Sequence, residues 1–114
     1  MDKIQLSARM TAHEGKLDEL IELGKQCIAL VRENEPNSMQ YEYFVNRDSG
    51  EVVVRETYVD SNAMLAHLGN VGPVLGQMLG VSTPMIKVYR NASAELKGAL
   101  EGLPTSYHEF LASA

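Results

Sequence analysis

Residues 51–73, EVVVRETYVDSNAMLAHLGNVGP, decide the fold because they predict a strand that leads directly into a helix, in the middle of a repeated strand–helix pattern. The side chains of residues 51–59 divide by alternation between two faces, as in a β-strand. Asp60 or Ser61 can then cap a helix, since a short side-chain oxygen accepts a hydrogen bond from a free backbone N–H group. The repeating positions of this helix are Ala63, Met64, His67 and Leu68.

Two dipeptides within this helical pattern, Gly69-Asn70 and Gly72-Pro73, are typical of breaks in regular structure. Proline is tolerated in the first turn of a helix, where its missing N–H group would have no partner anyway. We therefore predict that the helix is interrupted here, and that a short second helix begins at Pro73 and continues through Leu79.

The segment upstream has the same order of a strand followed by a helix. Residues 3–10 alternate between apolar and polar side chains and predict a half-buried strand. Thr11 and Glu14 have the spacing of a capping box, and apolar residues recur every three or four positions from Leu17 to Val31. This pattern predicts a long amphipathic helix that ends before Pro36, because proline cannot continue the hydrogen-bond ladder.

A hairpin and a final strand complete the pattern. Residues 38–46 predict a strand, and the turn sequence NRDSG at residues 46–50 returns the chain into the strand at 51–59. Residues 83–90 predict a fourth strand, and residues 93–103 predict a C-terminal helix. The tail that follows carries aromatic side chains, so we expect it to dock on another part of the protein.

The resulting order, βαββαβ, predicts a ferredoxin-like α+β fold: a four-stranded antiparallel sheet with both main helices on one face. A chain of 114 residues suits one modest core. We expect residues 1–92 to form this unit, and residues 93–114 to pack on it or on a partner subunit.

The hairpin strands contain many apolar side chains on both faces. One face carries Met39, Tyr41, Tyr43, Val45, Val52, Val54 and Tyr58, and the other carries Phe44, Val53 and Val59. An apolar patch of this size is typical of an association surface. We therefore expect a homodimer in which two sheets pack face to face. The alternative is a monomer whose open face is partly covered by the C-terminal tail.

The composition argues against several classes of function. Ten basic and fifteen acidic residues give a net charge of −5 without a basic cluster, so we expect no nucleic-acid partner. The single cysteine, Cys27, lies on an apolar stripe, and no metal-ligand spacing of His and Cys occurs. No leader and no stretch that could span a bilayer are present, so we expect a cytoplasmic protein without a membrane partner.

Four short motifs together resemble the antibiotic biosynthesis monooxygenase family of the dimeric α+β barrel superfamily, which includes small quinol monooxygenases. They are Glu35-Pro36-Asn37, MQYEYF at residues 39–44, Glu56 with Tyr58 and Asp60-Ser61, and AMLAH at residues 63–67. The resemblance extends from about Lys3 to Arg90. Asn37 stands where the family has glycine, and residues 69–80 lengthen the segment after His67.

The resemblance implies a homodimer with a pocket in each subunit between the sheet and the second helix. It implies a cofactor-independent monooxygenase that oxidises a small aromatic or quinol substrate with O2, without metal, flavin or haem. The alternative is a non-catalytic dimeric barrel that binds a small apolar ligand or acts in a stress response.

His67 and Glu56 are the candidate catalytic residues. An imidazole exchanges a proton near neutral pH, and quinol oxidation requires a phenolate. The structural alternative for His67 is a helix-capping or core histidine bonded to a backbone carbonyl. Glu56 could orient His67 or accept the proton, or it could form a structural ion pair with a neighbour of Arg55 or with Arg90 across the sheet.

Aromatic and methionine side chains are the candidate substrate-binding residues, because they form flat and adaptable apolar walls. Each has a structural alternative in sheet, dimer or core packing. The candidates are Tyr41, Tyr43, Tyr58, Met64, Met78 and Met85.

Overall fold

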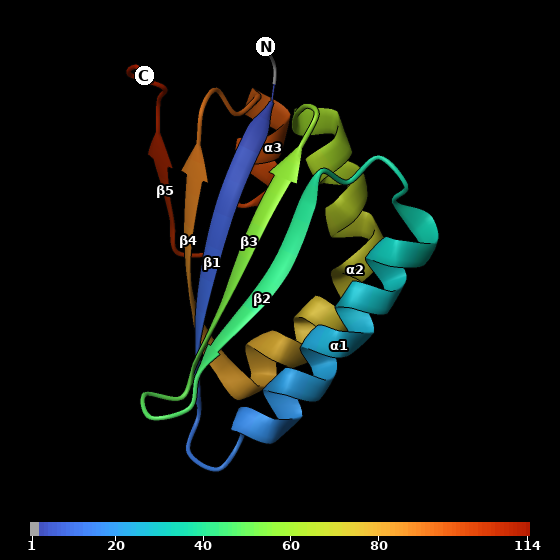
Figure 1. Cartoon of the computed structure of the whole chain (residues 1–114), viewed down its shortest axis with the longest axis vertical. Coiled ribbons are helices and arrows are strands. Elements are labelled where there is room, and N and C mark those ends of the chain that lie inside the picture. The colour runs from blue at the N-terminus through green and yellow to red at the C-terminus, as the bar shows by residue number, and fades with distance from the viewer. Residues whose placement is uncertain (1–2) are drawn as a thin grey trace.

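The computed structural model describes residues 3–114, which form one mixed sheet with the helices packed against one of its faces (Figure 1). Their bounds are β1 Ile4–Ala12, α1 Leu17–Asn34, β2 Gln40–Asn46, β3 Glu51–Tyr58, α2 Ser61–Val81, β4 Ser82–Tyr89, α3 Ala94–Ala99 and β5 Thr105–His108. The ferredoxin-like α+β fold predicted from the sequence is confirmed. The first two residues of the expected 1–92 unit lie outside the described residues.

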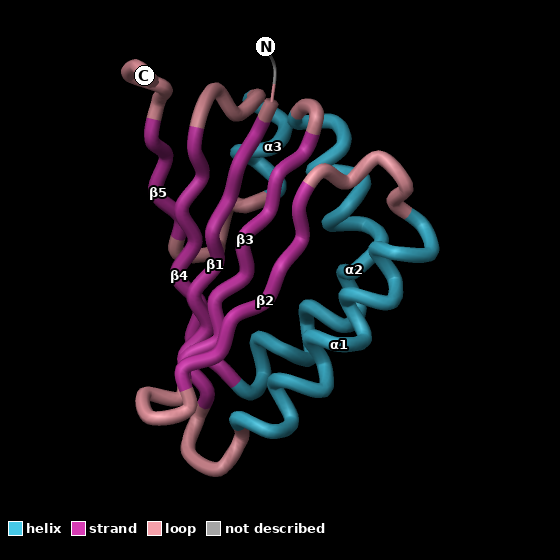
Figure 2. Tube along the Cα trace, in the orientation of Figure 1, coloured by secondary structure: helices cyan, strands magenta, loops and turns pink. Residues whose placement is uncertain are grey.

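The sheet has the strand order β2-β3-β1-β4-β5, so the first strand lies at its centre (Figure 2). β1 pairs antiparallel with β3 and β4, and β2 pairs antiparallel with β3. β5 runs parallel to β4, with Thr105 opposite Ile86. The prediction of four antiparallel strands is therefore wrong by one strand. The edge of β4 offers backbone N–H and C=O groups that the C-terminal tail pairs with.

α1 begins later than the capping-box pattern predicted. β1 continues through Ala12, and Lys16 occupies the N-cap without a side-chain hydrogen bond. Thr11 pairs instead with Glu51 in β3 and with Thr83 in β4, so sheet pairing prevails over the local cap. The buried stripe of α1 consists of Leu20, Leu23, Gly24, Cys27 and Val31.

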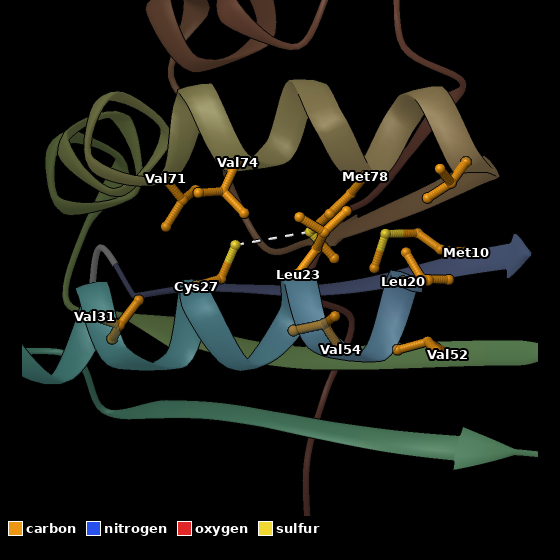
Figure 3. Packing of buried hydrophobic residues seen from close by; sticks show 11 residues of the cluster. Met10, Leu20, Leu23, Cys27, Val31, Val52, Val54, Val71, Val74 and Met78 are labelled. Atoms are coloured by element: carbon orange, nitrogen blue, oxygen red, sulfur yellow. Dashed lines mark hydrogen bonds between the residues drawn. The ribbon is translucent and has the colours of Figure 1, made fainter. Parts of the chain in front are cut away.

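α2 is one continuous helix, so the predicted interruption between Gly69 and Pro73 is wrong. Of the two candidate caps, Asp60 caps the helix, accepting a hydrogen bond of 2.8 Å from the backbone N–H of Ala63. Pro73 inside the helix removes one backbone donor, which bends a helix rather than ending it when both halves are packed. In Figure 3 the part of α2 that follows Val71 is seen from the side, whereas the turns before it are seen nearly end-on. The two halves of α2 therefore point in different directions, and the helix is bent.

Two buried clusters fill the space between the sheet and the helices. The first joins α1, the second half of α2, β1 and β3 (Figure 3); its members are Met10, Leu20, Leu23, Cys27, Val31, Val52, Val54, Val71, Val74, Met78 and Val81. The second joins the first half of α2 to β1, the end of β3, β4, and α3 with the residue that follows it; its members are Ile4, Leu6, Tyr58, Met64, Ile86, Val88, Leu96 and Leu100. The bend in α2 lets one helix contribute to both clusters.

The two faces of the sheet divide the apolar side chains unequally. Val52, Val54 and Tyr58 are buried under the helices, beside the half-buried Tyr41 and Tyr43. The open face is mixed: it exposes 52% of Phe44, together with the polar residues Gln5, Ser7, Arg9, Glu42, Arg55 and Lys87. The surplus of apolar surface is therefore smaller than expected, because α1 and α2 cover much of the hairpin.

Candidate active site

A cavity of about 60 Å³ lies between the helix-covered face of the sheet and α2. Most of its wall is apolar: Leu6, Ala8, Met10, Val54, Met64, Leu68, Val71, Leu75, Met78, Leu79, Pro84, Ile86, Leu100 and Leu103. Polar or titratable atoms reach the wall from Cys27, Tyr41, Tyr43, Glu56 and His67. The last two come from separate elements, β3 and α2, so the fold brings both candidate catalytic residues to one cavity.

His67 lies between two carboxylates. It is buried on the second turn of α2, where the turn from Asp60 aims it at the sheet. Its Nδ1 lies 3.0 Å from Oε2 and 3.1 Å from Oε1 of Glu35, the residue that follows the last turn of α1. Its Nε2 lies 3.4 Å from Oε1 of Glu56. Both ring nitrogens of the imidazole therefore have an acidic partner.

Glu56 occupies an inward position of β3 between two buried apolar residues, Val54 and Tyr58. The Tyr58 hydroxyl donates a hydrogen bond of 2.7 Å to its Oε1. Burial raises the pKa of the Glu56 carboxyl, while His67 and the Tyr58 hydrogen bond oppose the rise. Arg90, the ion-pair partner considered from the sequence, instead donates from Nε to Gln5.

Glu35, His67, Glu56 and Tyr58 form a unit that we call the carboxylate–histidine cluster. With an imidazolium between two carboxylates, the three charged groups carry one net negative charge. With a neutral imidazole protonated on Nδ1, Glu56 holds the proton and faces Nε2. These two states differ only in the position of one proton across 3.4 Å. The cluster can therefore accept or release a proton at the cavity wall.

Tyr41 and Tyr43 extend the polar end of the cavity from neighbouring inward positions of β2. Their hydroxyl oxygens lie 2.7 Å apart, and the Tyr41 ring packs edge-on against the His67 ring at 5.0 Å. Burial raises the pKa of both phenols, so they remain protonated and can donate hydrogen bonds. Gly24 lets α1 approach the Tyr43 ring, because a Cβ there would lie 2.7 Å from Cε2.

The other expected binding residues occupy three different environments. Met64 and Met78 line the cavity from α2. Tyr58 is fully buried beside Glu56 and outside the cavity lining. Met85 pairs with Arg9 and lies on the open face, since its neighbours Pro84 and Ile86 point into the cavity.

Glu35 and Cys27 are site residues that the sequence reasoning did not select. Glu35 was quoted only as part of the Glu35-Pro36-Asn37 turn, yet an acidic residue held at the end of a helix by a following proline was an available signal. Cys27 lines the cavity, and burial raises the pKa of its thiol. Its Sγ contacts Sδ of Met78 at 3.7 Å (Figure 3).

Residues 3–114 contain no group of three or more His, Cys, Asp or Glu side chains arranged to hold a metal ion. In the carboxylate–histidine cluster the two carboxylates contact different nitrogens of one ring, on opposite sides of it, so they do not converge on a common point. Over the same described range, no helix has both the length and the apolar character required to traverse a bilayer.

Solved structures with the same fold include two of particular interest. MupZ from Pseudomonas fluorescens has a TM-score of 0.83 at 18% sequence identity, covering 100% of this chain and 94% of its own. SnoaB, a cofactor-independent oxygenase from Streptomyces nogalater, has a TM-score of 0.68 at 18% identity, covering 82% of this chain and 97% of its own. At this level of identity, the similarity establishes a shared fold.

A protein from Shewanella oneidensis is 26% identical, with a TM-score of 0.69, and the match covers 77% of this chain and 89% of that one. A search of curated protein sequences finds no match. The family model described as antibiotic biosynthesis monooxygenase matches residues 4–72, more than half of the chain and the whole segment that carries Glu35, Glu56 and His67. The chain belongs to the antibiotic biosynthesis monooxygenase family.

Proposed function

We propose that the protein is a cofactor-independent monooxygenase that oxidises a small aromatic or quinol substrate with O2 in the cavity between the sheet and α2. The observation that carries the proposal is the contact between His67 and Glu56 at the wall of a largely apolar cavity. Membership in the monooxygenase family and the fold shared with a cofactor-independent oxygenase support it.

In the proposed reaction, the His67–Glu56 pair removes a proton from a substrate hydroxyl. The resulting phenolate is electron-rich enough to pass one electron to O2, and recombination forms a carbon–oxygen bond. Loss of water from the hydroperoxide completes the step: the hydroquinone gains one oxygen atom and loses two hydrogen atoms, and the second oxygen atom leaves as water. The proton held by the pair is returned to the departing oxygen.

The surroundings of the pair suit this chemistry. The hydroxyls of Tyr41 and Tyr43 share one hydrogen bond, so one of the two keeps a free O–H group that can donate to a developing oxyanion, and the apolar wall excludes water from it. The volume of about 60 Å³ is smaller than the roughly 300–1,000 Å³ of typical ligand pockets. Binding therefore requires side chains to move, and the flexible Met64 and Met78 are suited to do so.

We further propose that the protein works as a homodimer joined through the open face of the sheet. Members of the family are typically dimeric. The exposed ring of Phe44 and the half-buried Val53 and Met85 on that face support an interface with a polar rim.

Oxygen consumption tests the catalytic proposal. Hydroquinones and naphthohydroquinones are supplied to the protein in an oxygen-electrode assay, with protein-free autoxidation subtracted. His67→Ala should abolish the protein-dependent rate while preserving the circular dichroism spectrum. His13→Ala, at an exposed histidine outside the cavity, is the matched control and should retain the rate. Unchanged turnover in His67→Ala would refute the proposed role.

The second candidate function is binding of a small apolar ligand without catalysis. It is favoured because the polar atoms of His67 and Glu56 already have partners within the folded chain: Glu35 and Glu56 for His67, and Tyr58 for Glu56. A buried and fully satisfied polar cluster can serve structure alone. Tight binding of a quinone, with no oxygen consumption for any hydroquinone, would favour this function over the first.

A further inference from the structure

Glu35 is held at the junction of the two long helices by contacts that aim its carboxylate at His67. Asn70, one turn after His67 on α2, donates from Nδ2 to Glu35 Oε2 at 2.7 Å and to the Leu30 carbonyl at 3.1 Å. Asn34 donates to Oδ1 of Asn70 at 2.9 Å. The last turn of α1 and the second and third turns of α2 are thus connected through one carboxylate.

The contacts with Glu35 favour a proton on Nδ1 of His67. A carboxylate only accepts hydrogen bonds, and both Glu35 oxygens lie within 3.1 Å of Nδ1. A proton on Nδ1 therefore satisfies this contact. Nε2, the nitrogen that faces Glu56, is left as the atom that gains and loses a proton.

The contact between Glu35 and His67 is largely buried, unlike an ion pair on the protein surface. The side chain of Glu35 is 11% exposed and that of His67 is 4% exposed. Glu35 is absent from the cavity lining, whereas His67 and Glu56 line it. Glu35 therefore acts on the cavity only through the imidazole.

We propose that Glu35, held by Asn70, is a positioning residue that keeps the Nδ1 proton on His67 and so reserves Nε2 for proton exchange with Glu56 and the substrate. The catalytic part of this inference rests on the proposed monooxygenase function. The part about the tautomer concerns the folded protein alone, so the two can fail separately. Asn70 is assigned the supporting role because its amide donates to Oε2 of Glu35, one of the two oxygens that contact Nδ1 of His67, and is itself anchored to the Leu30 carbonyl.

Nitrogen-15 NMR of histidine-labelled protein tests the tautomer without substrate. The three histidine signals are assigned with His13→Ala and His108→Ala variants. We expect Nδ1 of His67 to be protonated in the wild type, and Glu35→Ala to move the proton to Nε2 in a large fraction of the molecules. Glu35→Gln, which retains an acceptor oxygen, should preserve Nδ1 protonation. Glu33→Gln is the control, since it removes the same charge from an exposed position of α1.

Two outcomes would overturn the tautomer assignment: an unprotonated Nδ1 in the wild type, or identical His67 signals in wild type and Glu35→Ala. A circular dichroism spectrum that matches the wild type identifies the variants that are suitable for comparison. If Glu35→Ala does not fold, Asn70→Ala provides the second test, with partial loss of Nδ1 protonation expected.

Turnover tests the positioning role. Glu35→Ala should lower kcat with a hydroquinone by about tenfold to a hundredfold, by analogy with the range found when the partner that orients a metal-binding histidine is removed. KM should stay within about twofold, because Glu35 does not line the cavity. Glu35→Gln should recover most of kcat. A shifted tautomer with unchanged kcat would overturn the positioning role alone, and absence of wild-type turnover would overturn the proposed function while leaving the NMR result intact.

Discussion

Substitution of Gly24 by alanine probes how closely α1 is packed against the cavity wall. A Cβ at this position would lie 2.7 Å from Cε2 and 3.0 Å from Cδ2 of Tyr43. The ring is constrained, because its hydroxyl is bonded to that of Tyr41 at 2.7 Å and because it lines the cavity. We therefore predict that Gly24→Ala displaces Tyr43 and destabilises the protein.

Two opposing effects set the change in unfolding free energy caused by Gly24→Ala. Alanine in a helix interior is favoured over glycine by about 1 kcal/mol. Overpacking by one methyl group in a close-packed core costs about 1–3 kcal/mol. The net expectation is a loss of about 0–2 kcal/mol in the free energy of unfolding. Gly76 in α2 isolates the first effect, because a Cβ there has no neighbour within 4 Å. Gly76→Ala should stabilise the protein by about 1 kcal/mol.

Urea unfolding followed by circular dichroism measures both variants under the same conditions. Because the propensity gain is common to both, the difference between their unfolding free energies reports the clash with Tyr43, and we expect about 1–3 kcal/mol. Equal stabilisation of Gly24→Ala and Gly76→Ala would refute the inference that Tyr43 is packed against α1. Tyrosine fluorescence provides a second measure, since only the Gly24 variant should alter the environment of Tyr43.

Three further predictions concern other parts of the molecule. Burial raises the pKa of Glu56 above its ordinary value of 4.5, so protonated Glu56 stabilises the folded state fully below about pH 4.5. This contribution is lost as the pH rises through the folded-state pKa. In urea unfolding, the stability of Glu56→Gln relative to wild type should therefore increase across that pH range. Asp60→Ala should lower the unfolding free energy by about 1 kcal/mol through loss of the α2 cap, whereas Asn62→Ala, at an exposed neighbour, should have a smaller effect. Phe44→Asp should shift the protein toward monomer in sedimentation equilibrium if the open face is the dimer interface, and an unchanged assembly state would place the interface elsewhere.

The local patterns of the sequence predicted most of the elements correctly. Alternation identified both strands of the hairpin, the three- and four-residue repeat identified α1, and Asp60, one of the two candidate caps, caps α2. Each of these signals depends only on residues that lie close together in the sequence. They failed where a distant partner competed: strand pairing held Thr11 in β1, and packing on both halves of α2 kept Pro73 inside one helix.

The family motifs in the sequence also pointed to His67 and Glu56 as candidates, but only the tertiary structure brings them into contact at one cavity. Glu35 reaches His67 across 32 positions of the chain, a contact that no periodicity encodes. The sequence by itself determined the order of the elements and their apolar faces, because these depend on backbone geometry and local burial. The pairing of an imidazole with two carboxylates, and the share of the sheet left open, were decided by how the bent α2 packs against α1 and β3.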